Sequence, residues 1–209
     1  MFLFHKICRR IVWPTLRLVY RPKIKGLENI PKEEGGYMII SNHLGIIDCF
    51  AIAMLFRQRI HFMAKKELFN KKLKAKFISW LGGIPVDRDK LDLSTVKTCL
   101  NTLKQDKILV VFPEGTRNKT NNQELLPIKG GACMIAYMAE VKILPLAMKS
   151  KYKPFRKNYM YIDKPYDFSE YQGQKLNAEL SETLTQDMKL RLEGCLEKVN
   201  EFSKEAKVK

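Results

Sequence analysis

The sequence predicts a single α/β domain in which helices flank a mixed, mostly parallel central sheet. Short apolar runs alternate with stretches of helical periodicity along almost the whole chain, which is the pattern of a layered α/β fold. A length of 209 residues, 45% of them hydrophobic and 29% charged, suits one globular domain with a full core. No internal repeat, low-complexity tract or long linker interrupts this pattern.

The apolar runs give the expected strands, and the helical patterns fill the intervals between them. Strands are expected at residues 37–41, 61–64, 84–87, 108–112, 142–148 and 158–162. Helices are expected at residues 46–56, 73–81, 93–103 and 131–139. A long C-terminal helix is indicated by apolar residues at near-fourfold spacing, which are Leu176, Leu180, Leu184, Met188, Leu192, Leu196 and Val199. This stripe should pack on the sheet, whereas residues 203–209 are expected to fray and residues 118–126 to form a polar loop.

Residues 1–21 form a distinct segment, which we interpret as an amphipathic helix lying in the membrane interface, ahead of a domain spanning residues 22–209. Charged residues interrupt its apolar character, so it lacks the roughly 18–20 uncharged residues of a spanning helix. Its basic residues fall on one face, and its aromatic residues suit headgroup depth. The residues expected to contact lipid are Phe2, Phe4, Lys6, Arg10, Trp13 and Arg17. Pro14 would kink the helix, and an ordinary helix covering the core is the alternative.

The chain is strongly basic, with 38 Lys and Arg against 22 Asp and Glu and a formal charge of +16. Such a surface attracts a polyanion, which includes nucleic acid, an anionic membrane and an acidic carrier protein. The lysine cluster at residues 71–76 lacks the interleaved aromatic residues of a nucleic-acid site, so no nucleic-acid partner is expected. The five cysteines are widely spaced without a C-x-x-C pair, so we expect reduced, mostly buried thiols and no metal site.

Residues 41–48 (SNHLGIID) offer a base with a carboxylate that can orient it. His43 should lie on a turn between a strand and a helix, and Asp48 should lie one turn into that helix. A carboxylate there would fix the imidazole tautomer and leave the other ring nitrogen to accept a proton. This spacing alone also fits a structural histidine that caps the helix.

Residues 111–117 (VFPEGTR) offer a fixed turn that ends in a guanidinium. Arginine binds phosphate bidentately and keeps its charge in a partly dry site. Two further cations follow turns marked by Gly or Pro, Arg88 after a predicted strand and Lys129 before a predicted helix. Each cation alone fits a surface charge. Together with His43 and Asp48, they indicate that a hydroxyl is activated on a substrate that carries a phosphate.

Four short blocks, in this order along the chain, resemble the 1-acylglycerol-3-phosphate acyltransferase family within the wider glycerolipid acyltransferases. They are residues 42–48, 84–88 (IPVDR), 112–117 and 143–147 (ILPLA). Residues 64–68 (AKKEL) also resemble a segment of this family, and the likeness extends roughly from Lys23 to Leu196. The resemblance implies a fold like that of glycerol-3-phosphate acyltransferase.

The resemblance also implies an activity, the acylation of lysophosphatidic acid to phosphatidic acid in phospholipid biosynthesis. His43, paired with Asp48, would deprotonate the 2-hydroxyl, which would attack an acyl thioester of coenzyme A or of an acyl carrier protein. No metal and no bound cofactor are implied. The implied substrate-binding residues are Lys65, Arg88, Glu114, Gly115, Thr116, Arg117, Lys129 and Pro145. Arg88 and Arg117 would hold the phosphate, Glu114 would place the glycerol, and Pro145 would shape the acyl groove. The protein would lie peripherally on the cytoplasmic face of the membrane.

One residue departs from the family pattern, because many members have Ser where this chain has Gly45. Two alternatives stay open. A related acyltransferase could use another acceptor, such as glycerol-3-phosphate or another lysolipid. A non-catalytic module that binds anionic lipid would need the basic surface but not His43 with Asp48.

Overall fold

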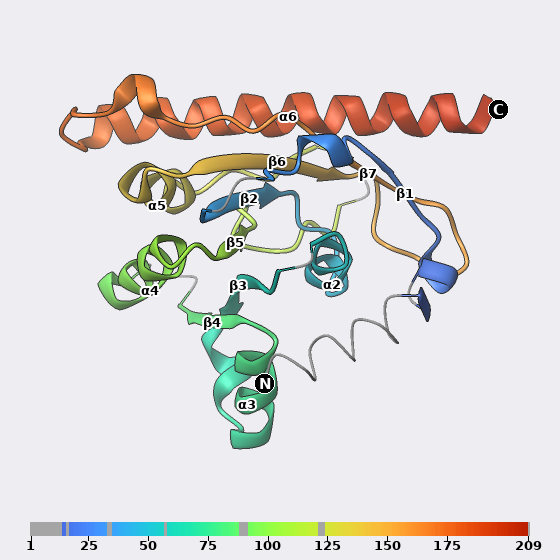
Figure 1. Cartoon of the computed structure of the whole chain (residues 1–209), viewed down its shortest axis with the longest axis horizontal. Helices are drawn as coiled ribbons and strands as arrows, with labels where there is room; N and C mark the ends of the chain where they lie inside the picture. Colours follow the sequence, from blue (N-terminus) through green and yellow to red (C-terminus); the bar gives the residue numbers. More distant parts are fainter. Residues whose placement is uncertain are drawn as a thin grey trace.

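The structure is a computed structural model that describes residues 14–15, 17–32, 35–56, 58–87, 92–120 and 124–208. These residues contain a seven-stranded sheet of order β1-β7-β6-β2-β5-β3-β4 (Figure 1). Its strands are β1 (Pro22–Lys25), β2 (Tyr37–Ser41), β3 (Ile60–Lys65), β4 (Gly83–Val86), β5 (Ile108–Val111), β6 (Lys142–Met148) and β7 (Asn158–Ile162). Neighbouring strands are parallel except β6 and β7, which are antiparallel. The predicted mixed, mostly parallel sheet is therefore confirmed.

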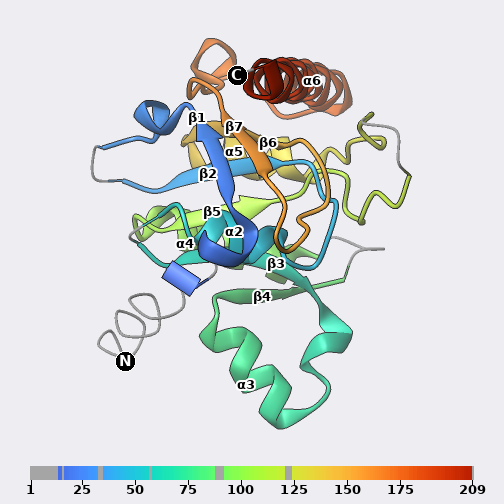
Figure 2. The same ribbon diagram turned by 90° about the vertical axis from the view of Figure 1, so that its right-hand side faces the viewer.

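Helices cover both faces of this sheet. They are α2 (Asp48–Ala53), α3 (Lys72–Trp80), α4 (Leu93–Lys104), α5 (Gly131–Ala139) and α6 (Ala178–Val208), with short 3₁₀ turns η1 (Leu27–Asn29), η2 (Lys66–Phe69) and η3 (Ser169–Tyr171). Figures 1 and 2 show α6 running along one side of the sheet, while α3 projects at the opposite end of the molecule, beyond the edge strand β4.

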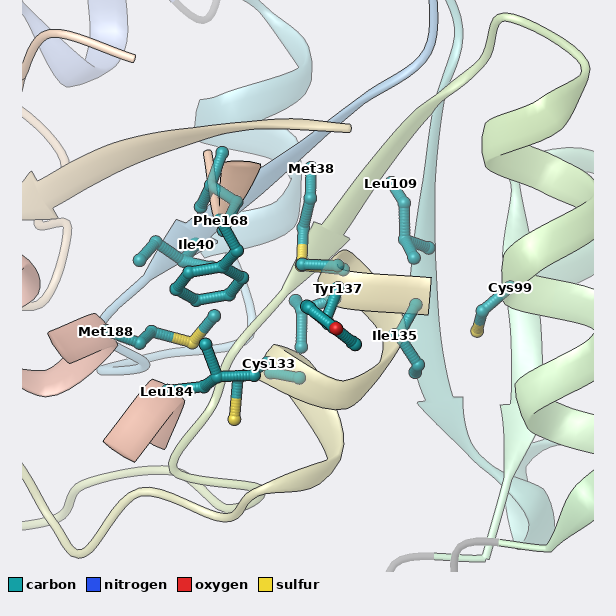
Figure 3. Close-up of a cluster of buried hydrophobic side chains, with 14 of the residues drawn as sticks. Met38, Ile40, Cys99, Leu109, Cys133, Ile135, Tyr137, Phe168, Leu184 and Met188 are labelled. Atoms are coloured by element: carbon teal, nitrogen blue, oxygen red, sulfur yellow. The ribbon is translucent and has the colours of Figure 1, made fainter. Parts of the chain in front are cut away.

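The central strand β2 is buried on both faces, which explains its continuous apolar sequence. Met38 and Ile40 join a core with residues of α4, α5 and α6 (Figure 3). Tyr37 and Ile39 join a second core with residues of α2. The alternation of side chains along one strand thus divides the molecule into a sheet with α2 on one face and α4, α5 and α6 on the other.

The six predicted strands are all present, and the residues of the predicted α6 stripe are buried or packed against the core. Three expectations need correction. Helix α2 runs from Asp48 to Ala53, so Asp48 is its first residue and does not lie one turn into a helix at residues 46–56. Strand β1 was missed because its sequence, PKIK, is short and half charged, yet it extends the sheet by pairing with β7. Fraying after residue 203 was wrong, since α6 stays helical to Val208. The ring of Phe202 packs edge-on against Tyr159, which holds this end on the sheet.

The predicted interface helix falls mostly outside the described residues, including Phe2, Phe4, Lys6, Arg10 and Trp13. Residues 17–20 are helical, Arg17 is exposed, and the segment leads into β1. The Phe155 N–H donates to the carbonyl of Val19 at 2.6 Å, which ties this end to the loop before β7. Within the described part of the chain, none of the helices combines the length and apolar character needed to cross a bilayer.

Because β2, β3, β4, β5 and β6 run in the same direction, their carboxyl ends lie together at one end of the sheet. The segments that leave this end of the sheet carry residues 42–48 and residues 112–118, and the IPVDR block reaches the same end at the close of β4. Ligand sites of open α/β sheets lie just outside the carboxyl ends of the strands.

Candidate active site

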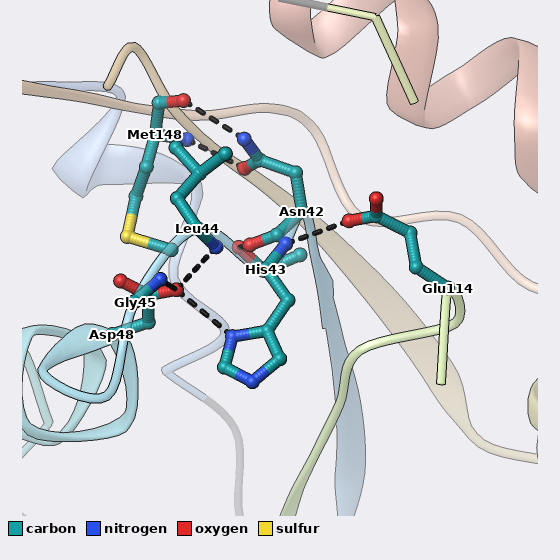
Figure 4. A network of polar contacts seen from close by, with 8 residues as sticks. Asn42, His43, Leu44, Gly45, Asp48, Glu114 and Met148 are labelled. Carbon is teal, nitrogen blue, oxygen red and sulfur yellow. Dashed lines mark hydrogen bonds and ion pairs between the residues drawn. The ribbon is translucent and has the colours of Figure 1, made fainter. Parts of the chain in front are cut away.

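The candidate base lies on the turn between β2 and α2. His43 Nδ1 is 2.9 Å from Asp48 Oδ2, and the side chains are only 8% and 1% exposed (Figure 4). Because a carboxylate accepts hydrogen bonds, this contact assigns the proton to Nδ1 and leaves the Nε2 lone pair free. The imidazole therefore has the tautomer that a general base needs at Nε2.

Backbone groups of the same turn fix the Asp48 carboxylate. Its Oδ2 also accepts hydrogen bonds from the N–H groups of Leu44 at 2.6 Å and Gly45 at 2.7 Å. Three donors on one oxygen fix the orientation of the carboxylate and, through it, of the His43 ring. The other oxygen, Oδ1, is buried and has no hydrogen-bond partner among the described residues.

Asn42 ties the turn to the neighbouring strand β6. Its Nδ2 donates to the carbonyl of Met148 at 2.9 Å, and its Oδ1 accepts from the Met148 N–H at 2.8 Å (Figure 4). The side-chain amide thereby continues the β2–β6 pairing beyond its last backbone pair, Ser41 with Leu146. This contact fixes the point at which the chain leaves the sheet toward His43.

The segment after β5 holds the backbone of His43. Glu114 is buried, and its Oε1 accepts from the His43 N–H at 2.7 Å while its Oε2 accepts from the Leu126 N–H at 3.1 Å. The Asn118 N–H donates to the His43 carbonyl at 2.7 Å. Both backbone polar groups of the candidate base are therefore satisfied by one loop. Burial raises the pKa of Glu114 above its ordinary value, against the opposing effect of the two N–H donors.

His43 borders an apolar groove of about 430 Å³. The groove is lined by His43, Met63, Val86, Asp87, Leu93, Val96, Val111, Phe112, Pro113, Gly115, Lys129, Gly131, Ala132 and Met134. The ring of Phe112 stacks on the imidazole, with centroids 4.1 Å apart and planes at 19°. This volume and mostly apolar lining suit an apolar ligand beside a few polar groups, which are His43, Asp87 and Lys129.

Gly115 allows the turn after β5 to meet the start of α5. Its φ of 66° lies in the left-handed region, and a Cβ there would stand 3.0 Å from the Lys129 side chain. The Lys129 N–H donates to the carbonyl of Pro113 at 2.9 Å. These contacts bring Lys129, 14 positions further along the chain, against the predicted phosphate turn.

A polar cleft of about 660 Å³ follows the same β2–α2 turn. It is lined by Asn42, Leu44, Gly45, Ile46, Ile47, Arg117, Asn118, Lys119, Thr120, Glu124, Met148, Lys149, Ser150, Lys151 and Leu196. Four of these residues are cations, whereas Glu124 is the only acid among them. Since His43 borders the groove and its neighbours 42 and 44–47 border the cleft, the turn separates an apolar space from a cationic one.

The cations predicted to bind the substrate lie in different parts of the structure. Arg117 lines the polar cleft, whereas Lys129 lines the apolar groove. Lys65 ends β3, is exposed and pairs with Glu67 at 2.9 Å. Arg88 lies outside the described residues. The structure therefore brings Lys129 next to Gly115 but does not bring Arg117, Lys129 and Lys65 to a common point.

The other predicted binding residues occupy different settings. Gly115 lines the groove, and Thr116 is exposed on the turn. Pro145 lies inside β6 opposite Ile40 and lines neither the groove nor the cleft, so its position does not favour the predicted role in shaping the acyl groove. Among the described residues, no group of three or more His, Cys, Asp or Glu side chains gathers to hold a metal ion.

Sequence reasoning gave no role to several residues that the structure places at the site. Asn42 and Asn118 hold the base through contacts with β6 and with the His43 carbonyl, and Phe112 stacks on its ring. Lys151 lies over Gly45, with its Cγ 3.3 Å from the position that a Cβ would take. Only Asn42 and Phe112 fall in a recognised block, and no spacing indicated their partners.

Comparisons with known proteins agree with the motifs. A family model described as Acyltransferase matches residues 21–149. The chain is 32% identical over 204 residues to a 1-acyl-sn-glycerol-3-phosphate acyltransferase of Bacillus subtilis, an alignment that covers 93% of this chain and 100% of that protein. It is 32% identical over 171 residues to the human 1-acyl-sn-glycerol-3-phosphate acyltransferase alpha, covering 80% of this chain and 58% of that protein.

The fold is shared with a solved structure. The crystal structure of the 1-acyl-sn-glycerophosphate acyltransferase PlsC from Thermotoga maritima superposes with a TM-score of 0.63 at 24% identity, covering 91% of this chain and 82% of that chain. The family predicted from the four blocks is therefore confirmed, and the chain belongs to the Acyltransferase family, among relatives of the 1-acyl-sn-glycerol-3-phosphate acyltransferases.

Proposed function

We propose that this enzyme transfers a fatty acyl group from an acyl thioester to the sn-2 hydroxyl of lysophosphatidic acid, forming phosphatidic acid in phospholipid biosynthesis. The observation that carries the proposal is the oriented His43–Asp48 pair at the wall of an apolar groove. The names of its relatives in bacteria and in humans support lysophosphatidic acid as the acceptor.

The proposed reaction begins with proton transfer to His43 Nε2 from the acceptor hydroxyl. The hydroxyl oxygen attacks the carbonyl carbon of the thioester, so that a C–O bond forms and the C–S bond then breaks. The imidazolium returns the proton to the departing thiolate, which leaves as a free thiol. Asp48 stabilises the imidazolium between these steps, because its Oδ2 already accepts from Nδ1.

The two cavities suit the two parts of an amphipathic substrate. An acyl chain would occupy the apolar groove. Arg117 would hold the phosphate from the polar cleft, together with Arg88, and Lys129 would add positive charge at the wall of the groove near the reacting thioester. Gly115 and Thr116 would shape the turn between these groups. Glu114 would act mainly by holding the backbone of His43, since both of its carboxyl oxygens already accept N–H groups.

The basic surface suits a donor or a membrane of negative charge. With a formal charge of +16, the chain would bind an acidic acyl carrier protein, the phosphates of acyl-CoA, or an anionic bilayer. We propose a peripheral position on the cytoplasmic face of the membrane, where lysophosphatidic acid would be drawn from the lipid surface. No further cofactor is needed, because the thioester is itself a substrate.

The decisive experiment measures free thiol released from palmitoyl-CoA and from an acylated carrier protein, with and without lysophosphatidic acid. His43→Ala should abolish acceptor-dependent release, and the better thioester identifies the donor. His61→Ala is the matched control, because it removes an imidazole from β3 that lines neither the groove nor the cleft.

The outcomes separate the proposal from its two alternatives. Release that requires glycerol-3-phosphate or another lysolipid would indicate a related acyltransferase with a different acceptor. Binding to anionic vesicles without thiol release from any donor would indicate a lipid-binding module. Release that survives His43→Ala would refute His43 as the base.

A further inference from the structure

Helix α3 presents an apolar stripe to solvent. Leu73 is 87% exposed and Phe77 is 56% exposed, and none of the nine residues of α3 is buried. The ring of Trp80 stacks on Phe77, with centroids 6.1 Å apart. Positions 73, 77 and 80 follow one another at helical spacing, so these side chains form a continuous stripe.

The packing of α3 on the sheet fixes the direction of this stripe. Ile78 packs so closely on Gly83 of β4 that a Cβ there would stand 2.4 Å from the Ile78 Cγ2. At about 100° per residue, the stripe is centred about 130° around the helix from Ile78. The residue that anchors α3 therefore turns the stripe away from the domain, and Figures 1 and 2 show the helix projecting beyond β4.

Positive charge flanks the stripe. Lys72, Lys74 and Lys76 lie within α3 and Lys71 precedes it, all are exposed, and the helix contains no acidic residue. Arg59 reaches the same end, where its Nη2 donates to the carbonyl of Ser79 at 2.5 Å. With Leu73, Lys76, Phe77, Ser79 and Trp80, Arg59 lines a shallow depression of about 610 Å³.

We propose that α3 is a membrane-contact surface in its own right, which lies in the headgroup region of an anionic bilayer with Leu73, Phe77 and Trp80 toward the acyl chains. Apolar side chains bordered by lysines match the apolar interior and the negative surface of such a bilayer. The proposal rests on the proposed function in that the substrate is a membrane lipid, and it names the element that meets the lipid surface.

The neighbouring structure connects this surface to the site. η2 and α3 pack on one another and on β4, and Leu68 of η2 is 36% exposed. Strand β4 lies next to the apolar groove, whose lining includes Val86 and the 79% exposed Leu93. A bilayer seated on α3 would therefore lie beside the end of the sheet that carries the groove.

Tryptophan fluorescence tests the insertion directly, because the chain has two tryptophans and Trp13→Phe leaves Trp80 alone. The probe is vesicles of phosphatidylglycerol with brominated phosphatidylcholine. We expect a blue shift and bromine quenching of Trp80 that weaken when phosphatidylglycerol is replaced by neutral lipid. If vesicles that carry the protein leave Trp80 emission unchanged and unquenched, the proposal is wrong.

A pair of variants tests the surface in the full chain with both tryptophans. Leu73→Glu with Phe77→Glu should weaken partition onto phosphatidylglycerol vesicles at least about tenfold, because it removes apolar contact and adds two negative charges. Leu190→Glu on α6 changes another exposed leucine (57%) and is the matched control for Leu73→Glu alone, since each adds one negative charge; it should change partition less than about twofold. Equal effects would overturn the proposal, and so would unchanged vesicle binding by an α3 variant whose circular dichroism matches that of wild type.

The same variants separate this proposal from the proposed function. Turnover of a short-chain, water-soluble lysophosphatidic acid should be retained by the α3 variant, while turnover of vesicle-borne substrate falls. Loss of both activities together would argue for damage to the site instead of lost membrane contact. A wild-type protein that binds vesicles through Trp80 but acylates no acceptor would leave the α3 surface standing and refute the acyl transfer.

Discussion

The substitution Gly45→Ser tests how Asp48 is held. Asp48 Oδ1 is buried without a hydrogen-bond partner among the described residues, whereas Oδ2 accepts three hydrogen bonds. A Cβ at position 45 would stand 3.5 Å from Oδ1, so a serine hydroxyl there would reach it. The φ of Gly45 is not in the left-handed region, so a serine fits the backbone.

The expected gain follows from the contacts. A hydrogen bond to a buried charged acceptor contributes about 1.5–3 kcal/mol. The nearest obstacle is the Lys151 Cγ at 3.3 Å, which belongs to a flexible, exposed side chain that can move. We therefore expect Gly45→Ser to be about 2 kcal/mol more stable than Gly45→Ala, which corresponds to about 4–8 °C in Tm for a domain of this size.

Gly45→Ala is the control because it adds the same Cβ and the same loss of backbone freedom without the hydroxyl. Urea unfolding and thermal melts of the three proteins give the comparison, and the m-values must agree for the difference to count as stability. Equal stability of the Ser and Ala variants would refute the assignment of Oδ1 as an unsatisfied acceptor in reach of position 45.

Three further substitutions test the site and its surroundings. Asp48→Asn should lower the rate of acyl transfer by about 10³–10⁴-fold with little change in KM, because the amide no longer stabilises the imidazolium; an unchanged rate would refute its role. Glu114→Gln should have a lower free energy of unfolding than wild type, and this difference should narrow as the pH rises above 4.5. Burial raises the pKa of Glu114 in the folded state, so wild type loses stability as this carboxyl group ionises. A difference in urea midpoints that stays constant with pH would contradict this. His61 has a pKa lowered to about 4 by burial and by the nearby Arg59 and Lys107. Wild type should therefore lose stability as the pH falls from 6.5 toward 4, where only the unfolded chain gains the proton, and His61→Gln should flatten that loss in melts across this range.

The sequence predicted the buried strands of the fold better than the strand at the exposed edge of the sheet. Strand β2 was found because five consecutive residues are buried on both faces, which requires an apolar run. Strand β1 was not found because it lies at the sheet edge, where alternate residues are exposed and charge is tolerated. Helix α2 is shorter than predicted, Asp48–Ala53 instead of residues 46–56, because an apolar pattern does not mark where a helix begins and ends.

The candidate site was predicted in its local part only. His43 and Asp48 are five positions apart, so one turn brings them together and the spacing reveals them. The bond between Asn42 and Met148 joins residues 106 positions apart and has no local pattern. The phosphate prediction placed Arg117 and Lys129 after turns marked by Gly or Pro, but such turns do not reveal which cavity each side chain lines.

The hydrogen bonds that position His43 come from segments of three adjacent strands, so the position of one imidazole depends on how these strands pair. Its own strand β2 sets the position of the turn, β6 holds Asn42, and the segment after β5 holds both backbone polar groups of His43 through Glu114 and Asn118. A base that must meet a hydroxyl and a thioester carbonyl needs positional precision, which rigid elements with hydrogen-bonded support provide. Because β2 lies between β5 and β6, the centre of the sheet is the place where three such supports can converge on one turn.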